Sequence, residues 1–339
     1  MQQLPDATVI VINWNGLGYL DTCFEALLKQ DVEGGFEAML LDNASSDGST
    51  RHVRERWPTV RVVESGGNLG FAAGNNLGIR SARGRHIVLL NADTAVQPGW
   101  LRALIEAVEA SPTIGAVTSK LVFMADPSEV QNAGSLLLSD GSGADRGFHE
   151  RDHGQFDARE EVFGACGAAV LYRREMLDDV GMFDETFFNY YEDTDLSWRM
   201  RLRGWKVLYE PRAVVHHVHA GSSGEWSPFF IFHVDRNRLF MILKNAPLGM
   251  VLKTFARFAG LAAANAARTS ISRIIRPPVA LERVNQGPGR ARIHVKVVAS
   301  LLRHLPEMLR KRWRIRRRRS VPNSEITKWF YPRELWRSR

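Results

Sequence analysis

Residues 86–93 read HIVLLNAD, an apolar run of strand length that ends in the polar side chains Asn91 and Asp93. Three similar runs precede it, at residues 8–13 (TVIVIN), 38–42 (AMLLD) and 60–64 (VRVVE). Their length and β-branched content predict buried strands. Helical spacing is found at residues 19–30, 49–57, 72–83 and 99–110. Alternating strands and helices predict an α/β fold, in which a parallel sheet carries helices on both faces.

Polar residues follow the first, second and fourth of these strands, at residues 13–15 (NWN), 42–49 (DNASSDGS) and 91–93 (NAD). Ligands of parallel sheets bind at this carboxyl edge. An Asp there can accept hydrogen bonds from a nucleobase or ribose, and Asp93 can hold Mg²⁺ or Mn²⁺ beside a diphosphate. Simpler interpretations stay open, because Asp47 also suits a helix cap and Asp93 a turn.

A second acidic cluster, Glu192-Asp193-Thr194-Asp195, opens a predicted helix at residues 193–203 and follows the aromatic run 187–191. Three carboxylates in one turn are unfavourable unless the helix dipole, a cation or a reaction uses them. Asp193 is either a general base beside a polar acceptor or an N-cap.

Three histidines lie in the extended segment 206–218 and just after it. Strand alternation puts His217 and His219 on one face and His216 on the other, so at most part of the trio can meet one metal. A strand at 167–172 and a helix at 174–180 are also predicted, whereas residues 125–160, rich in Gly, Ser, Asp and His, predict a long surface loop.

In this order the motifs resemble glycosyltransferase family 2, the inverting enzymes of the GT-A fold, and in particular its bacterial rhamnosyltransferase-like branch. The resembling runs include VIVINWNG, LLDNASSDGS, GGNLGFAAGNNLGIRSARG, VLLNADT, the stretch from Phe163 to Trp205, and VVHHVHAGSS. They cover most of residues 8–223. The resemblance implies a Rossmann-like, mostly parallel sheet flanked by helices in residues 1–225. Within it, residues 1–120 would bind the nucleotide sugar and residues 121–225 would form the acceptor and catalytic half.

The resemblance also implies roles for single residues. Asp193, paired with Glu192, would be the catalytic base, and Asp93 would bind the metal together with His216, or with His217 if the register differs by one. The residues implied in nucleotide-sugar binding are Asn13, Trp14, Asn15, Asp42, Asn43, Asn68, Gly70, Phe71, Asn91 and Asp93. Those implied in acceptor binding are Gly164, Cys166, Gly167 and Tyr191.

The implied reaction moves a sugar from a nucleoside-diphosphate sugar to a hydroxyl of a saccharide or lipid-linked saccharide in cell-surface polysaccharide synthesis. At the level of the family branch the donor is dTDP-L-rhamnose, and a UDP-hexose or another donor stays open. Mg²⁺ or Mn²⁺ would neutralise the leaving diphosphate. A nucleotidyltransferase is the alternative enzyme, but the loop after the first strand, NWNGLGYL, lacks the basic residue expected there.

The C-terminal part differs from the rest in charge. Of the 339 residues, those from 251 onward hold 22 Lys and Arg against 4 Asp and Glu, and the preceding ones hold 23 against 33. Apolar residues mixed with Arg predict that residues 226–339 form a basic helical region that associates with an anionic membrane surface. A nucleic-acid-binding tail and a solvated tail without a dedicated partner are the alternatives. The acidic N-terminal part and the lack of a nucleic-acid-binding motif disfavour the former.

The expected location is the cytoplasm, at the inner face of the cytoplasmic membrane. The first fifteen residues lack the pattern of a signal peptide, and residues 250–267 are broken by charged and amide side chains. The two cysteines, Cys23 and Cys166, match no metal or redox spacing and are expected to be small buried residues.

Overall fold

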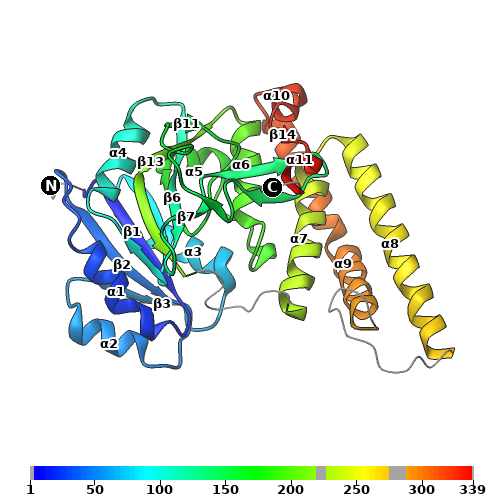
Figure 1. Ribbon diagram of the computed structural model, residues 1–339, viewed down its shortest axis with the longest axis horizontal. Coiled ribbons are helices and arrows are strands. Elements are labelled where there is room, and N and C mark those ends of the chain that lie inside the picture. Colours follow the sequence, from blue (N-terminus) through cyan, green and yellow to red (C-terminus); the bar gives the residue numbers. More distant parts are fainter. Residues whose placement is uncertain (1–3, 219–226, 275–287, 338–339) are drawn as a thin grey trace. The chain divides into compact units, whose positions relative to one another are not determined.

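The computed structural model describes residues 4–218, 227–274 and 288–337 (Figure 1). The chain divides into two compact units. The first comprises Met1–Leu138, Gly143–Ser222 and Ser320–Arg339, and the second comprises Ser139–Ser142 and Ser223–Arg319. The last twenty residues, which the sequence places with the basic region, thus pack with the first unit.

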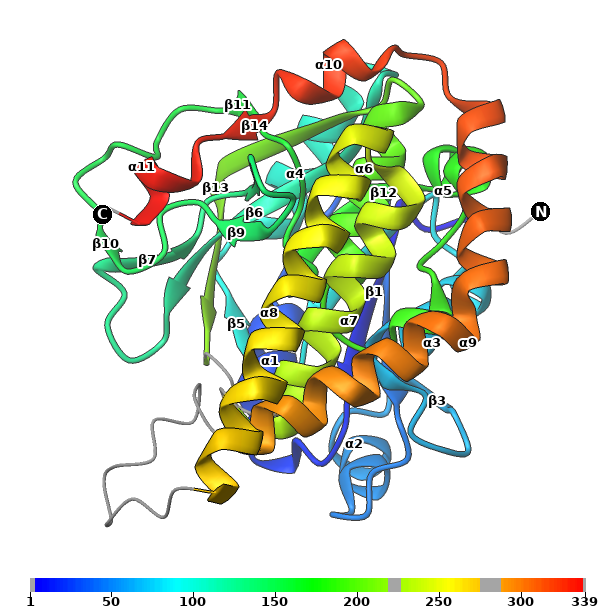
Figure 2. The ribbon, with the colours of Figure 1, turned by 90° about the vertical axis from the view of Figure 1, so that its right-hand side faces the viewer.

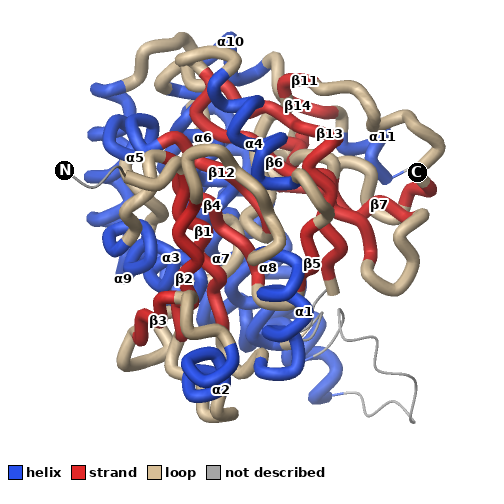
Figure 3. The backbone as a smooth tube through the Cα atoms, turned by 90° about the vertical axis from the view of Figure 1, so that its left-hand side faces the viewer, coloured by secondary structure: helices blue, strands red, loops and turns tan. Residues whose placement is uncertain are grey.

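The first unit is built on a parallel β/α succession. Its strands are β1 (Ala7–Asn13), β2 (Phe36–Asp42), β3 (Arg61–Glu64) and β4 (His86–Asn91), and its helices are α1 (Leu17–Leu27), α2 (Ser49–Arg56), α3 (Gly70–Ser81) and α4 (Trp100–Glu109). The strands lie in the order β3-β2-β1-β4, all parallel (Figure 3). Each predicted strand and helix of this half is confirmed, with bounds that differ by a few residues.

The sheet continues beyond β4 in mixed directions. The added elements are β5 (Thr94–Val96), β6 (Ile114–Phe123), β12 (Ala169–Arg173), β13 (Lys206–His217), α5 (Arg174–Val180), the 3₁₀ turn Glu185–Phe187 and α6 (Glu192–Leu202). Strand β12 is antiparallel to both β4 and β6, and β13 runs parallel to β6 and antiparallel to β5. The fold class, a mostly parallel sheet flanked by helices, is confirmed.

The expectation of a long loop at residues 125–160 is wrong. The segment carries the short strands β7 (Glu129–Asn132), β8 (Ser135–Leu138), β9 (Gly143–Asp145), β10 (Glu150–Arg151) and β11 (Glu160–Glu161). Strands of this length show no readable alternation and depend on partners elsewhere: β7 pairs with β6, and β8 pairs with β14 (Phe330–Tyr331) near the C-terminus. Helices α10 (Asn323–Thr327) and α11 (Arg333–Arg337) flank β14.

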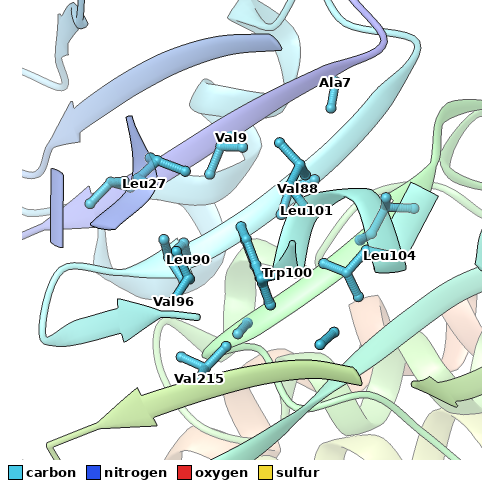
Figure 4. Close-up of a cluster of buried hydrophobic side chains, with 14 of the residues drawn as sticks. Ala7, Val9, Leu27, Val88, Leu90, Val96, Trp100, Leu101, Leu104 and Val215 are labelled. Carbon is cyan, nitrogen blue, oxygen red and sulfur yellow. The ribbon is translucent and has the colours of Figure 1, made fainter. Parts of the chain in front are cut away.

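Strand alternation divides the core of the first unit between the two faces of the sheet. On β4, Val88 and Leu90 face α1 and α4, whereas Ile87 and Leu89 face α3 and α6. Figure 4 shows the first cluster, in which the fully buried Trp100 of α4 packs over the sheet. The core therefore fixes the positions of the strand ends that form the site.

The second unit is helical and consists mainly of α7 (Pro228–Asn245), α8 (Leu248–Ile274) and α9 (Pro288–Arg318) (Figure 2). Asp235 of α7 and Arg290 of α9 form an ion pair of 2.8 Å, and the Arg312 guanidinium donates to the carbonyls of Leu243 and Ala246 at the end of α7. Helix α9 contains Pro306 and bends along its length. No helix in the described part of the chain combines the length and apolar content that crossing a bilayer requires.

Candidate active site

The polar ends of β1, β2 and β4 meet at one edge of the sheet, as the sequence predicts. Strand pairing sets Asn13 opposite Asp42 and Ile12 opposite Asn91. The loops that follow are therefore neighbours, and their side chains form one continuous polar surface at the carboxyl edge.

Asp42 and Asn13 form the buried floor of this edge. The Asn13 amide donates to Asp42 Oδ1 at 3.1 Å and to Ser45 Oγ at 3.0 Å, and Asp42 Oδ2 accepts from the Ser45 N–H at 2.9 Å. Asn15 ties the same loop through its Oδ1, which accepts from the Ser46 N–H. Trp14 between them keeps 46% of its surface exposed, so its indole is open to a ligand.

Asp47, for which a capping role stayed open, bonds to backbone on both sides. Its Oδ1 accepts from the Ser49 N–H and hydroxyl, and its Oδ2 accepts from the Leu17 N–H at 2.9 Å. Burial opposes ionisation, but these hydrogen bonds together hold the pKa of Asp47 below its usual value. Asp47 thus joins the starts of α1 and α2.

Asn43 braces the turn at residues 68–71. Its Nδ2 donates to Asn68 Oδ1 and the Gly70 carbonyl, both at 3.1 Å, and its Oδ1 accepts from the Leu69 N–H. Gly70 has φ +75°, and a Cβ there would lie 2.5 Å from the Phe188 carbonyl oxygen. Only glycine fits this position, because both the backbone conformation and the close approach exclude a side chain.

The segment before α6 is held in a rare backbone conformation. Phe188, Tyr190 and Tyr191 have φ of 64°, 70° and 69°, values that non-glycine residues seldom adopt. The Phe188 carbonyl accepts from the Ala72 N–H of α3 at 3.1 Å, which ties the segment to the turn at Gly70. Such backbone concentrates at functional sites, and here it places Tyr191 directly before the acidic cluster.

Asp193 is held by neutral donors at the start of α6. Its Oδ2 accepts from the Gly167 N–H at 3.1 Å, and its Oδ1 accepts from the N–H and hydroxyl of Thr194. Burial raises the pKa of Asp193 although these hydrogen bonds oppose the shift. A carboxylate whose pKa is raised toward neutrality is a better proton acceptor.

Glu192 and Asp195 lie on either side of Asp193 in the sequence and have different surroundings. Glu192 is 5% exposed, and its Oε2 has no hydrogen-bond partner within the described residues. Burial, with the neighbouring Asp193 charge, raises the pKa of Glu192 well above its usual value. Asp195 is buried and forms a 2.9 Å ion pair with Arg199. Asp193 is therefore the carboxylate of this turn that is ionisable and still partly accessible.

Asp193 lies next to the end of β4. The Ala168 carbonyl accepts from the Asn91 N–H at 2.9 Å, and the adjoining Gly167 N–H donates to Asp193. The two polar clusters that the sequence separates by a hundred residues are thus joined through the consecutive residues Gly167 and Ala168.

The expected acceptor residues have different surroundings. A Cβ at Gly167 would lie 3.0 Å from the Phe71 ring and 3.6 Å from Asp193 Oδ2. Gly167 therefore lies between Phe71 and Asp193. Gly164 instead faces Ser197, whose Oγ would be 2.7 Å from a Cβ there, so its small size serves the packing of α6.

The cysteines are unpaired and neutral. Cys166, half-buried beside Gly167, has its pKa raised well above 9 by burial and by the charges of Asp145 and Asp193. Burial likewise raises the pKa of Cys23 to about 12. Neither thiol has the thiolate character that a nucleophile needs.

The structure places His217, not His216, against Asp93. Its Nε2 is 3.2 Å from Asp93 Oδ1, whereas His216 turns to the other face and contacts Gln97 at 2.7 Å. The choice of His216 is corrected here. Antiparallel pairing of β13 with β5 sets His217 opposite Thr94, and alternation then directs the two rings to opposite sides.

Gln131 of β7 was missed because it lies in the segment expected to be a loop. Its Oε1 is 2.7 Å from His217 Nδ1 and can accept a hydrogen bond from it, while His217 Nε2 faces Asp93. Histidine ligands of metals are oriented in this way. Asn91 Oδ1 is buried nearby, with no hydrogen-bond partner in the described residues.

Asp93, His217 and Asn91 together offer two oxygens and one nitrogen. The described residues contain no group of three or more His, Cys, Asp or Glu that could hold a metal ion by themselves. A set of one carboxylate, one imidazole and one amide is compatible with Mg²⁺ or Mn²⁺ if ligand oxygens complete the shell.

Comparison with known families decides the class. The family model described as "Glycosyltransferase like family 2" matches residues 5–233. The chain belongs to glycosyltransferase family 2. The matched region contains every site residue described above, and the predicted resemblance is confirmed.

Two curated relatives of this glycosyltransferase are similar over the same region. N-acetylglucosaminyl-diphospho-decaprenol L-rhamnosyltransferase of Mycobacterium tuberculosis is 31% identical over 223 residues, covering 59% of this chain and 72% of the relative. O-antigen biosynthesis protein RfbC of Myxococcus xanthus is 27% identical over 234 residues, covering 66% and 18% respectively.

Solved structures show the fold of this glycosyltransferase. GalNAc-T7, crystallised with UDP, GalNAc and Mn²⁺, has a TM-score of 0.56 at 15% identity, covering 72% of this chain and 51% of its own. The mannosyltransferase PcManGT from Pyrobaculum calidifontis, in complex with GDP-Man and Mn²⁺, has a TM-score of 0.51 at 18% identity, covering 90% and 88%. The enzyme has the GT-A fold.

Proposed function

We propose that this glycosyltransferase inverts the anomeric centre of a nucleoside-diphosphate sugar, and that Asp193 is its general base. The observation that carries the proposal is the placement of Asp193: a half-buried carboxylate with a raised pKa, bonded to Gly167 and joined to the end of β4. The donor that fits the relatives best is dTDP-L-rhamnose, because the M. tuberculosis relative is named an L-rhamnosyltransferase. The acceptor is a hydroxyl of a saccharide or lipid-linked saccharide of the cell surface.

In the proposed step, Asp193 Oδ2 takes the proton of the acceptor hydroxyl as that oxygen forms a bond to the anomeric carbon. The bond from this carbon to the diphosphate breaks on the opposite face, and its electron pair leaves with the nucleoside diphosphate. The raised pKa of Glu192 disfavours a second negative charge beside Asp193 during the proton transfer. The Asp42 floor and the open indole of Trp14 would bind the nucleoside.

The donor atoms of Asp93, His217 and Asn91 support a divalent cation in this corner. The two solved structures named above hold Mn²⁺, and Mg²⁺ has the same preference for oxygen ligands. When bound, the cation would neutralise charge on the leaving diphosphate. Gln131 would keep the His217 ring oriented for it.

Donor binding and donor hydrolysis with a panel of UDP-, dTDP- and GDP-sugars test this function, each with Mn²⁺ or Mg²⁺ and then EDTA. We expect one nucleotide sugar to bind in a metal-dependent manner, Asp93→Ala to weaken that binding, and Asp193→Asn to retain binding but lose turnover. Absence of binding to every nucleotide sugar would overturn the donor assignment.

We further propose that the second unit attaches the enzyme to an anionic membrane surface, at the inner face of the cytoplasmic membrane. Helix α9 exposes a stripe of apolar side chains spaced three or four residues apart, each between 37% and 68% exposed. The stripe consists of Val295, Val298, Leu302, Leu305, Leu309 and Trp313. Such spacing defines one face of a helix.

Basic side chains border this apolar stripe. Exposed Lys and Arg occur along its length, and the run from residue 311 to 319 contributes five of them, Arg314 and Arg316 to Arg319. A helix with an apolar face and basic flanks lies in a lipid interface, with its charges near anionic headgroups. A nucleic acid would use the charges but would leave the leucines in water, so the stripe favours lipid.

Co-sedimentation measures this attachment. We expect binding to vesicles of phosphatidylglycerol and phosphatidylethanolamine, weaker binding to phosphatidylcholine vesicles, and partial release by salt. Equal binding to both vesicle types, or preference for duplex DNA over anionic vesicles, contradicts the proposal.

A further inference from the structure

A cavity of about 690 Å³ lies within the first unit and is not used by the chemistry above. Its walls come from two segments that are remote in sequence. Phe148 and Phe156 belong to the segment after β9, and Tyr331 and Trp336 belong to the C-terminal segment, which runs back across the first unit (Figure 2). The cavity forms where the C-terminal segment lies beside the segment after β9.

The C-terminal segment is anchored by specific contacts. Strand β14 pairs in parallel with β8, with Phe330 opposite Leu137, and the Phe330 ring packs edge-on against Trp198 of α6. The Arg201 guanidinium lies over the Trp329 ring, 4.1 Å from its centroid. These contacts hold Tyr331 in place at the cavity wall, and the following helix α11 carries Trp336 to the same wall.

The polar lining excludes an anionic ligand. Arg146, a basic residue of the wall, already donates to Glu160 and to the Ala133 carbonyl. Asp145 and Glu150 add carboxylates to the same wall. A phosphate or lipid diphosphate would meet two negative charges here, and the one guanidinium is already bonded.

Aromatic side chains beside hydrogen-bonding groups suit a neutral, polyhydroxylated ligand. Flat rings such as Trp336 and Phe148 cover the apolar face of a sugar ring, and the carboxylates of Asp145 and Glu150 can accept hydrogen bonds from its hydroxyls. Among the ligand classes of a glycosyltransferase, only a saccharide combines both properties.

Strand β9 connects this cavity to the proposed base. A Cβ at Gly143 would lie 3.1 Å from the hydroxyl oxygen of Thr194, which itself donates to Asp193. Asp145, two residues further along β9, lines the cavity. Two strand residues span roughly 7 Å. The cavity thus begins about one sugar ring away from the base.

We propose that this cavity binds the saccharide unit next to the acceptor sugar, so that the enzyme selects acceptors of two or more sugars over a monosaccharide. The proposal rests on the proposed function and names the acceptor class of that same site. Tyr331 and Trp336 would be specificity residues supplied by the C-terminal segment.

The test measures sugar binding to the full chain by saturation-transfer NMR. The probes are N,N′-diacetylchitobiose, maltose and lactose, each compared with its constituent monosaccharides. We expect at least one disaccharide to bind about tenfold more tightly than its monosaccharides, and Trp336→Ala to abolish that difference. If no disaccharide has an advantage, or if Trp336→Ala retains it, the proposal is wrong.

Matched variants separate loss of the cavity from loss of the fold. Leu335→Ala changes an exposed neighbour of Trp336 that does not line the cavity, and should bind as the wild type does. Glu150→Gln replaces one carboxylate of the wall without touching the aromatic anchors, and should weaken disaccharide binding severalfold.

Nucleotide-sugar binding is measured in parallel and distinguishes the two proposals. If the donor binds but Trp336→Ala does not change disaccharide binding, only the proposal for the cavity is rejected. If the wild type binds no nucleotide sugar, the proposed function is rejected, regardless of the result of disaccharide binding.

Discussion

The carboxyl edge of the sheet and helix α9 arrange charged and apolar side chains in opposite ways. At the edge, the carboxyl groups of the buried Glu192 and the half-buried Asp193 lie among neutral donors or apolar walls. On α9, leucines face outward between arginines. A buried carboxylate without a counter-cation has a raised pKa, and an exposed apolar stripe gains free energy when it is buried away from water. The two regions should therefore fail independently when they are altered.

The largest effect is expected at Asp193. Asp193→Asn keeps the hydrogen-bond acceptor for the Gly167 N–H but cannot take a proton, so turnover should fall about 10²–10⁴-fold. Donor affinity, measured by calorimetry, and attachment to anionic vesicles should not change. Asp178→Asn, an exposed position on α5, is the control. Turnover within a few-fold of the wild type would remove Asp193 from the mechanism.

The two neighbouring histidines give a matched pair. His217→Ala and Gln131→Ala should weaken metal-dependent donor binding roughly 10–100-fold, because the first removes a ligand and the second releases its orientation. His216→Ala, one residue away on the opposite face, should have little effect. A titration of Mn²⁺ in the presence of donor checks this order. A larger loss in His216→Ala than in His217→Ala would falsify the assignment.

Glu192 should make the stability of the fold depend on pH. Its pKa is raised on folding, so the folded state binds the proton more tightly than the unfolded chain does. The contribution is fully present below the ordinary value of 4.5 and is lost as pH rises through the raised value. Glu192→Gln cannot ionise, so its free energy of unfolding should fall less between pH 5 and pH 8. Urea denaturation at both pH values measures the difference. If the free energy of unfolding of both proteins changed equally with pH, the raised pKa of Glu192 would be contradicted.

Much of the carboxyl edge of the sheet could be predicted from the sequence. The apolar runs that become β1, β2 and β4 end in polar residues, so both the strands and the meeting of their ends follow from local pattern. Helix α5 has the predicted bounds, Arg174–Val180. The motifs of the family supplied Asp93 and Asp193, but only the fold shows that Gly167 and Ala168 join them.

Other features depend on contacts between distant residues. Strands β8 and β9 hold four and three residues, too few for a readable pattern, and β8 gains its partner β14 from the other end of the chain. Alternation separates His216 from His217 but cannot say which of them meets Asp93, because the pairing of β13 with β5 decides that. The positive φ of Tyr191 has no sequence signal, since nothing in an aromatic run demands it.

On α9 the expected losses concern membrane attachment alone. Leu302 is 67% exposed in the middle of the stripe. Leu302→Asn should weaken binding to anionic vesicles about tenfold, because a buried apolar group contributes about 0.8 kcal/mol per CH₂. Turnover of soluble acceptors should stay at the wild-type level. Leu4→Asn, equally exposed but in the first unit, is the control. An equal loss for Leu4→Asn would show that the stripe is not the lipid-binding face.

The smallest predicted effect separates the electrostatic from the apolar contribution to membrane attachment. Arg310 is exposed beside the stripe, and a basic side chain near an anionic surface contributes about 1 kcal/mol, so Arg310→Gln should weaken vesicle binding about fivefold at low salt. Salt screens that contribution but not the burial of Leu302. At high salt, therefore, Arg310→Gln should approach the wild type, whereas Leu302→Asn should remain weak. Arg51→Gln, an exposed arginine on α2, provides the matched charge change in the first unit. If both α9 variants converge with the wild type at high salt, attachment is purely electrostatic and the apolar stripe needs another occupant.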